Sequence, residues 1–245
     1  MRLGPAAIAV AWAGMAAAGA RAAETPERPR ALVVHGVLGL VRSFDESRTV
    51  HLFQERGTID TTYRGGLGPG AELGLQYGLR RRLGIQAAFG ASSRSVGARY
   101  AARLPHPLYL DAHRRSEGSI DALSYFELAG HVGLGYTGHT HGLAYTLFAG
   151  PSLYCVRAEL IERADTLERY PYDEVTVTLP TAKTSRLGPG VHAGASLHRP
   201  IGAALSLDVQ MRYGYGRVVL APNGDDRTRV HGSGPQLALG LRWAY

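Results

Sequence analysis

The feature that most constrains this chain is an alternation of apolar and polar side chains, clearest in LSLDVQMRYGYG at 205–216. Its odd positions hold leucine, valine, methionine and tyrosine, and its even positions hold serine, aspartate, glutamine, arginine and glycine. Successive side chains of a strand point to opposite faces, so a period of two predicts a strand with one apolar face. That face is either the core of a soluble barrel or the lipid-facing wall of a transmembrane barrel.

The alternation recurs along the chain after residue 30. The predicted strands cover 31–41, 67–79, 83–96, 122–136, 143–160, 186–197, a segment containing 205–216, and 232–245. The predicted connections are long at 42–66, 97–121, 161–185 and 221–229, and short at 80–82, 138–141 and 198–200. Outer-membrane barrels have an even number of antiparallel strands, short periplasmic turns and longer extracellular loops. We therefore predict an all-β fold, an eight-stranded antiparallel up-and-down transmembrane β-barrel over 31–245 with four long extracellular loops.

The last predicted strand indicates which face looks inward. Positions 237, 239, 241, 243 and 245 are Leu, Leu, Leu, Trp and Tyr, and the residues between them are polar or small. The interior of an eight-stranded barrel is just wide enough for side chains to fill, so large residues from every strand would overfill it. We predict that the apolar faces meet lipid and that aromatic residues near strand ends form an interfacial girdle. The predicted girdle consists of Tyr77, Tyr136, Tyr213, Tyr215, Trp243 and Tyr245.

The polar faces then line the lumen. Because buried charges are costly unless they are paired, we expect Glu72, Glu127 or Asp208 to pair with Arg212 or Arg242. Such a network predicts a polar plug, and the alternative is an ion-conducting or gated path. The predicted lumen residues are Glu72, Gln76, Gln86, Glu127, His131, His192, Asp208, Gln210, Arg212, Gln236 and Arg242.

The N-terminus indicates export. Residues 1–22 combine Arg2, a short Ala-rich apolar run and a small-x-small site at Ala20–Ala22, which predicts a cleaved signal peptide. Residues 23–30 are charged and Pro-rich, which predicts a disordered leader. The only cysteine, Cys155, lies too deep in the chain for a lipid anchor next to the signal. Together these features predict the outer membrane of a Gram-negative bacterium as the location.

Charge argues against a nucleic-acid partner. The formal net charge is +7, but the basic residues are scattered along the chain, and two of them, Arg2 and Arg21, belong to the predicted signal peptide. A nucleic-acid binder would cluster them on one surface. We therefore expect no nucleic-acid partner.

Three segments carry a family resemblance. LFAGPSLYCVRAEL at 147–160, LGPGVHAGASL at 187–197 and LSLDVQMRYGYGRV at 205–218 resemble the outer-membrane β-barrel domain of the small porin-like, OmpA-like superfamily. The resemblance covers roughly 31–245 and concerns the fold rather than an activity. It implies outer-membrane lipid as surroundings and, through the closing LALGLRWAY with its terminal Tyr245, the barrel-assembly machinery as a partner.

The sequence contains only weak candidates for a catalytic site or a metal site. His231-Gly232-Ser233 resembles the His-x-Ser site of eight-stranded lipid A deacylases, but no acid follows Ser233 and the wider pattern is missing. His139 and His141 are a two-residue match to a metal site, and His131 and His192 share a lumen-facing pattern. We predict no catalytic residues, no metal and no cofactor.

These features predict a non-enzymatic outer-membrane protein with a structural or surface-interaction role and an unknown loop ligand. A narrow pore for small solutes is the first alternative, and a lipid-modifying barrel enzyme is the second.

Overall fold

The computed structural model describes residues 30–80, 82–140, 142–168, 172, 174–221 and 228–245. The predicted signal peptide at 1–22, and the predicted leader at 23–30 except Arg30, lie outside the described residues. No helix among the described residues is long and apolar enough to cross a membrane.

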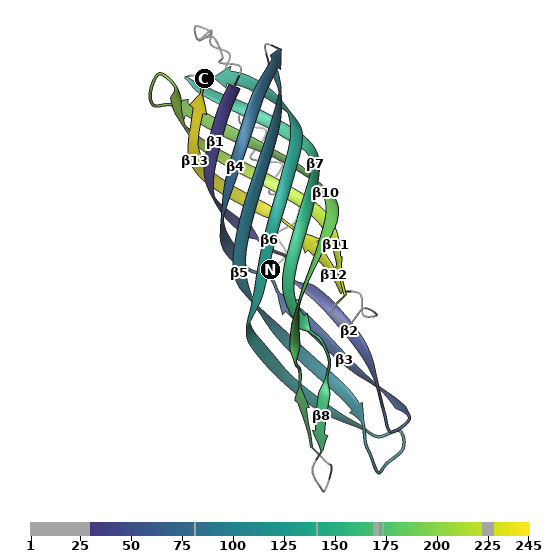
Figure 1. The fold of residues 1–245 in the computed structure, drawn as a ribbon. Helices are drawn as coiled ribbons and strands as arrows, with labels where there is room; N and C mark the ends of the chain where they lie inside the picture. Colours follow the sequence, from purple (N-terminus) through teal and green to yellow (C-terminus); the bar gives the residue numbers. More distant parts are fainter. Residues whose placement is uncertain (1–29, 81, 141, 169–171, 173, 222–227) are drawn as a thin grey trace.

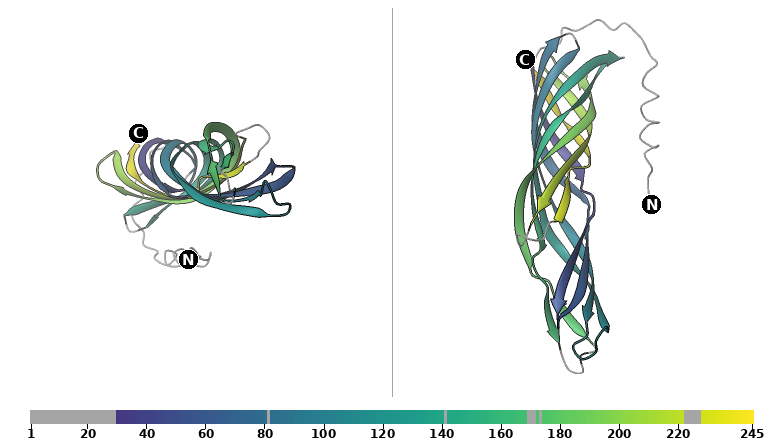
Figure 2. Two further views of the ribbon diagram at one scale, coloured as in Figure 1. Left: turned by 90° about the horizontal axis from the view of Figure 1, so that it is seen from below. Right: turned by 90° about the vertical axis from the view of Figure 1, so that its right-hand side faces the viewer.

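Eight strands close into a ring, as predicted. Each pairs antiparallel with the next, and β13 returns to pair with β1, for example through Leu38 opposite Leu237. Figure 1 shows the ring as a tilted barrel, and Figure 2 shows it from one end and from the side. The ring strands are β1 (Arg30–Leu40), β4 (Leu67–Arg80), β5 (Leu83–Pro105), β6 (His113–Thr140), β7 (Leu143–Ile161), β10 (Thr181–Pro200), β11 (Leu205–Leu220) and β13 (Pro235–Ala244).

The prediction of long loops is largely wrong at 42–66, 97–121 and 161–185, because most of the described residues there are β-structure, and most of the fourth predicted loop, 221–229, lies outside the described residues. Strands β5, β6, β7 and β10 run well past their predicted ends, and the segment 42–66 forms the hairpin β2 (Phe44–Leu52) and β3 (Glu55–Arg64) against β5. Strand β12 (Thr228–Gly232) pairs with β11, and β8 (Asp165–Glu168) pairs with β9 (Val175–Thr178). The strands β2, β3, β8, β9 and β12, together with the distal parts of the long ring strands, form the β-structure beyond the barrel. We call this structure the extramembrane sheet, and it is seen at the lower end of Figure 1.

Two of the short turns also differ from their predictions, because 138–140 belong to β6 and 198–200 belong to β10. Strand β10 runs through His198 to Pro200, and the bend follows at 201–204. Pro200 still pairs with Ser206, and the Ile201 amide donates to the Leu205 carbonyl oxygen at 2.9 Å, which moves the reversal a few residues further along the chain.

The alternation changes polarity along single strands. In the barrel part of β7, Thr146 and Ser152 are buried inside and Leu153 is exposed outside. Further along the same strand, Val156 and Leu160 are buried inside while Arg157 is exposed outside. A strand surrounded by lipid needs an apolar outer face, and one surrounded by water needs an apolar inner face. The inversion therefore marks where the strands leave the membrane.

The extramembrane sheet has its own apolar interior. Tyr63, Tyr125, Tyr154, Val156 and Leu160 belong to one buried cluster between the strands. A second cluster nearer the distal end contains Ile59, Leu104 and Val177. These clusters explain why polar-looking segments fold as strands, since burial of their apolar inner faces stabilises them.

Candidate functional site: the polar lumen

The alternation places all eleven predicted lumen residues on the inward face. Arg242 pairs in register with Val33 of β1 and Ser206 of β11. Gln76, Gln86, Gln236 and Arg242 are half-buried. The buried ones are Glu72, Glu127, His131, His192, Asp208, Gln210 and Arg212.

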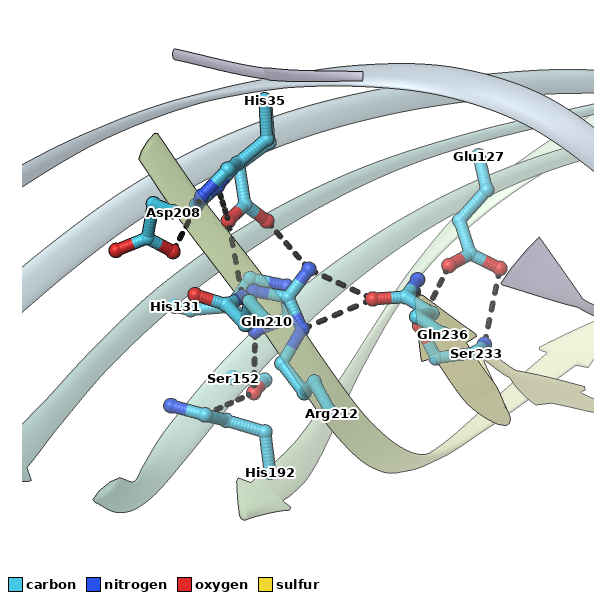
Figure 3. A network of polar contacts seen from close by, with 11 residues as sticks. His35, Glu127, His131, Ser152, His192, Asp208, Gln210, Arg212, Ser233 and Gln236 are labelled. Atoms are coloured by element: carbon cyan, nitrogen blue, oxygen red, sulfur yellow. Dashed lines mark hydrogen bonds and ion pairs between the residues drawn. The ribbon is translucent and has the colours of Figure 1, made fainter. Parts of the chain in front are cut away.

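Glu72 is the centre of the lumen network, and the residues around it are labelled in Figure 3. It forms an ion pair with Arg212 and accepts a hydrogen bond from Gln210 Nε2 at 3.4 Å. Its Oε1 atom lies 3.6 Å from His35 Nδ1, and His35 Nε2 lies 3.0 Å from Asp208 Oδ1. Two carboxylates, one guanidinium and one imidazole thus meet in the lumen, and each carboxylate has a partner, as buried charges require.

Of the pairs expected from the sequence, Glu72 with Arg212 is present, whereas the structure places His35 rather than Arg212 beside Asp208. His35 of β1 and Asp208 of β11 both lie opposite Gly240 of the intervening strand β13. A Cβ on Gly240 would come within 2.5 Å of His35 Cδ2 and 1.9 Å of the Val34 carbonyl oxygen. The bare glycine therefore lets His35 reach over β13, whereas Asp208 and Arg212 are four residues apart on one strand, roughly 13 Å.

A second branch extends from Arg212 toward the extramembrane sheet. Arg212 Nε donates to Gln236 Oε1 at 2.9 Å, and Gln236 Nε2 donates to Ser233 Oγ at 3.2 Å. Ser233 donates from its amide to Glu127 Oε2 at 3.0 Å and from its hydroxyl to Glu127 Oε1 at 2.9 Å. Tyr125 also donates to Glu127 Oε2, at 3.0 Å. A continuous chain of hydrogen bonds thus links both buried glutamates through Arg212 (Figure 3).

Two of the lumen histidines meet through a serine. Ser152 Oγ lies 2.8 Å from His131 Nδ1 and 2.9 Å from His192 Nδ1, and the imidazole rings are 4.9 Å apart. Since a hydroxyl donates only one proton, at least one imidazole must donate its Nδ1 proton to Ser152. The trio joins strands β6, β7 and β10 by side chains as well as by their backbone ladders.

Sequence reasoning missed four members of this network, namely His35, Tyr125, Ser152 and Ser233. His35 lies in the predicted strand with the least clean alternation, where apolar residues occupy both faces. Ser152 and Ser233 are small residues whose partners come from other strands. Conversely, no hydrogen bond between described residues joins Gln76 or Gln86 to the network; both line the small cavity beside it.

The lumen network borders a small cavity. A cavity of about 20 Å³ lies among His35, Glu72, Gln76, Gln86 and Arg212. A water needs at least about 10–15 Å³ of such volume, so this cavity holds roughly one water molecule.

The His231–Ser233 pair does not form a nucleophile and base. Ser233 is buried and points inward to Glu127, whereas the His231 ring lies 5.5 Å from the ring of outward-facing Tyr215. The two side chains are therefore on opposite faces of the wall. Among the described residues, no group of three or more histidine, cysteine, aspartate or glutamate side chains is placed to hold a metal ion.

The predicted girdle residues all face outward and are exposed. Tyr77, Tyr136, Trp243 and Tyr245 lie toward the short-turn end of their strands, and Tyr213 and Tyr215 lie toward the other end. Three tyrosines contact an arginine: the Arg30 guanidinium lies 5.7 Å from the Tyr77 ring centroid, Arg82 Nη1 donates to Tyr136 Oη at 3.0 Å, and Arg42 donates to Tyr213 Oη. Such amphipathic rings suit the two membrane–water interfaces.

Between the two aromatic levels, the outward face is apolar. Leu73, Phe89, Val132, Leu207 and Leu239 are all exposed there, although side chains this apolar are normally buried in a water-soluble protein. A closed ring without sheet edges, an apolar belt and a charged, paired interior together define a transmembrane β-barrel of the outer-membrane class. The fold class predicted from the alternation and from the OmpA-like resemblance is thereby confirmed.

Solved structures of outer-membrane and surface proteins are similar to the chain. They include the outer membrane protein OprG from Pseudomonas aeruginosa, with 12% identity and a TM-score of 0.47 over 89% of this chain and 96% of that chain. Neisserial surface protein A has 12% identity and a TM-score of 0.41 over 88% and 99%. Outer membrane protease OmpT from Escherichia coli has 8% identity and a TM-score of 0.44 over 91% and 99%. No family model and no curated protein matches the chain.

Proposed function

We propose that this chain is a non-enzymatic outer-membrane barrel with a closed polar lumen and a structural or surface-interaction role. The observation that carries the proposal is Arg212, which is buried in the lumen between Glu72 and Gln236. Removing one member of a buried ion pair costs about 3–5 kcal/mol, so the charges that fill the lumen resist separation. A lumen filled in this way supports a plug rather than a conducting path.

The surface-interaction part of the proposal is supported by the extramembrane sheet. Its strands share buried apolar clusters and are held by polar contacts such as Arg48 Nη1 to the Glu162 carbonyl oxygen at 2.7 Å. A rigid sheet beyond the membrane can present its tips to a partner with little loss of conformational entropy on binding.

Planar-bilayer recording of the refolded protein tests the plug. We expect little conductance from the native barrel, and a measurable increase when Arg212→Ala is combined with Glu72→Ala, which removes the central pair without leaving a lone charge. A large, stable conductance from the native barrel would instead make a narrow solute pore the function.

The proposal includes insertion by the barrel-assembly machinery. The Tyr245 amide donates to the Arg30 carbonyl oxygen at 3.0 Å, so the last residue lies at the closing seam of the ring. We expect Tyr245→Ala to reduce the heat-modifiable, folded fraction in outer-membrane preparations, whereas Tyr109→Ala, far from the seam, leaves it unchanged. Equal folded fractions would argue against recognition of this terminus.

A further inference from the structure

We propose that the distal end of the extramembrane sheet is a docking surface for an anionic lipid bilayer other than the one that holds the barrel. The inference rests on the proposed surface-interaction role and names its partner. It combines an exposed apolar tip with a basic face next to it. The apolar tip consists of Phe53, Leu108, Tyr109 and Leu110, and the basic face consists of His51, Arg56, Arg103, His113 and Arg115.

The apolar tip lies far outside the barrel's own membrane. Strand β6 has 28 residues. A membrane-spanning strand needs about 9–11 residues. The 13 residues His113–Tyr125 lie on the distal side of the belt, and at about 3.3 Å per residue and a tilt near 45° they carry the tip roughly 30 Å beyond it. Leu108, Tyr109 and Leu110 are 60%, 64% and 85% exposed there, so the barrel's own lipid cannot cover them.

The turns of the tip are fixed in shape. The amide of His106 donates to the Ala112 carbonyl oxygen at 2.8 Å, and His106 Nδ1 accepts from the Leu108 amide at 3.1 Å, which leaves Leu110 at the apex. The neighbouring β2–β3 turn is tied to this loop by the Asp111 amide, which donates to Glu55 Oε1 at 3.4 Å. The two turns thus present their apolar residues together.

The β2–β3 turn holds its aromatic residue at a conformational cost. Phe53 and Gln54 have φ of 52° and 67°, which is the two-residue turn that strongly prefers Asn-Gly. A bulky residue in this left-handed region is a backbone outlier and points to a role beyond folding. Phe53, half-exposed at the turn, gains apolar burial only if something covers it.

The basic face indicates that the partner is anionic. Arg103 and Arg115 lie directly opposite each other on the outer side of the β5–β6 pair, an arrangement of like charges that destabilises a sheet. Arg56 lies opposite His51 on the adjacent hairpin. Within the described residues, no carboxylate forms an ion pair with Arg56, Arg103 or Arg115.

Acidic residues border the basic face on its barrel side. The next outward-facing positions toward the barrel carry Asp60 and Glu117, opposite Ala101 on the strand between them. Apolar and aromatic residues beside cationic ones are the combination that binds the interface of an anionic membrane, where rings and aliphatic chains enter and the cations contact headgroups. A soluble polyanion would use the arginines but not the apolar tip.

Vesicle capture tests the proposal. The barrel, held in phosphatidylcholine nanodiscs on a surface, is exposed to fluorescent vesicles with and without phosphatidylglycerol. We expect capture of the anionic vesicles only, weakening as ionic strength rises. Each arginine near an anionic surface contributes about 1 kcal/mol, so Arg103→Gln and Arg115→Gln should each weaken capture about fivefold. Arg99→Gln, nearer the membrane on the same face, is the matched control and should leave capture unchanged.

The double change Phe53→Asn with Gln54→Gly separates binding from folding. It installs the preferred sequence of this turn, so the hairpin should resist protease at least as well as the native one while vesicle capture falls. Capture that survives both this change and Leu110→Asn overturns the proposal, as does capture of free heparin without capture of vesicles. A closed barrel that captures no vesicles overturns this inference alone, whereas a conducting barrel overturns only the proposed function.

Discussion

Glu72 of β4 and Arg212 of β11 form a buried ion pair although their strands are not neighbours in the ring, and β1 and β13 lie between them. Truncating Arg212 leaves Glu72 buried without its guanidinium, so Arg212→Ala should lower the free energy of unfolding by about 3–5 kcal/mol. Glu72→Gln combined with Arg212→Ala should cost less than the sum of the single changes. Urea titration in lipid measures all three, and strictly additive costs would show that the two residues are not coupled.

Gly240 should tolerate no side chain. Gly240→Ala places a methyl group against the His35 ring and the Val34 carbonyl oxygen, and overpacking of this kind costs about 1–3 kcal/mol. The matched control is Gly36→Ala on the outer side of β1, where the nearest atom to a new Cβ is 3.8 Å away. If both changes destabilise the refolded barrel equally, the glycine has no special role in the contact between His35 and Asp208.

The lipid face can be tested at two adjacent residues of β13. Leu239 is exposed on the belt and Ala238 is buried on the lumen side. Leu239→Arg should cost roughly 2–4 kcal/mol, as a charge near the bilayer midplane does in such barrels. Ala238→Ser should cost far less. The reverse order in urea titrations would contradict the assignment of faces.

The orientation of the barrel is open to thiol labelling on intact cells. In a Cys155→Ser background, a cysteine at Gln54 or Leu110 should react with an impermeant maleimide, because these turns lie on the extracellular side of the predicted topology. A cysteine at Gly202, in the opposite turn, should react only after the outer membrane is permeabilised. Labelling of Gly202→Cys in intact cells would invert the topology.

Tyr63 should make the extramembrane sheet sensitive to alkaline pH. Burial, together with the Glu46 carboxylate that accepts its hydroxyl proton at 3.0 Å, raises the pKa of Tyr63 well above its ordinary value of 10.0. The folded state then keeps a proton that the unfolded state loses, so stability falls as pH rises above about 10. Proteolysis of the sheet across this range measures the effect. Tyr63→Phe should flatten the dependence, and an unchanged slope in that variant would count against it.

The ring was predictable because its signal is local: the alternation of apolar and polar side chains within each strand indicates which face of that strand meets lipid. The contact of His35 with Asp208 was not, because it depends on how β1 and β11 come together across Gly240 once the ring has closed. The extramembrane strands could not be predicted from the sequence for a different reason. Beyond Tyr154 in β7, the polar side chains change from the inner to the outer face, so segments such as 161–185 lose the pattern that marked the barrel strands.

The inversion of polarity along β7 also sets how the barrel responds to bilayers of different thickness. If the barrel sank into the membrane by a few residues, Arg157 would enter the hydrocarbon. If it rose by as many, Leu153 and its neighbours on the belt would enter water. Neither shift is available at low cost, so hydrophobic mismatch must be taken up by the lipid, which thins or thickens around the protein at a fraction of a kcal/mol per Å. The distance from the bilayer to Leu110 is therefore set by the protein and not by the membrane around it.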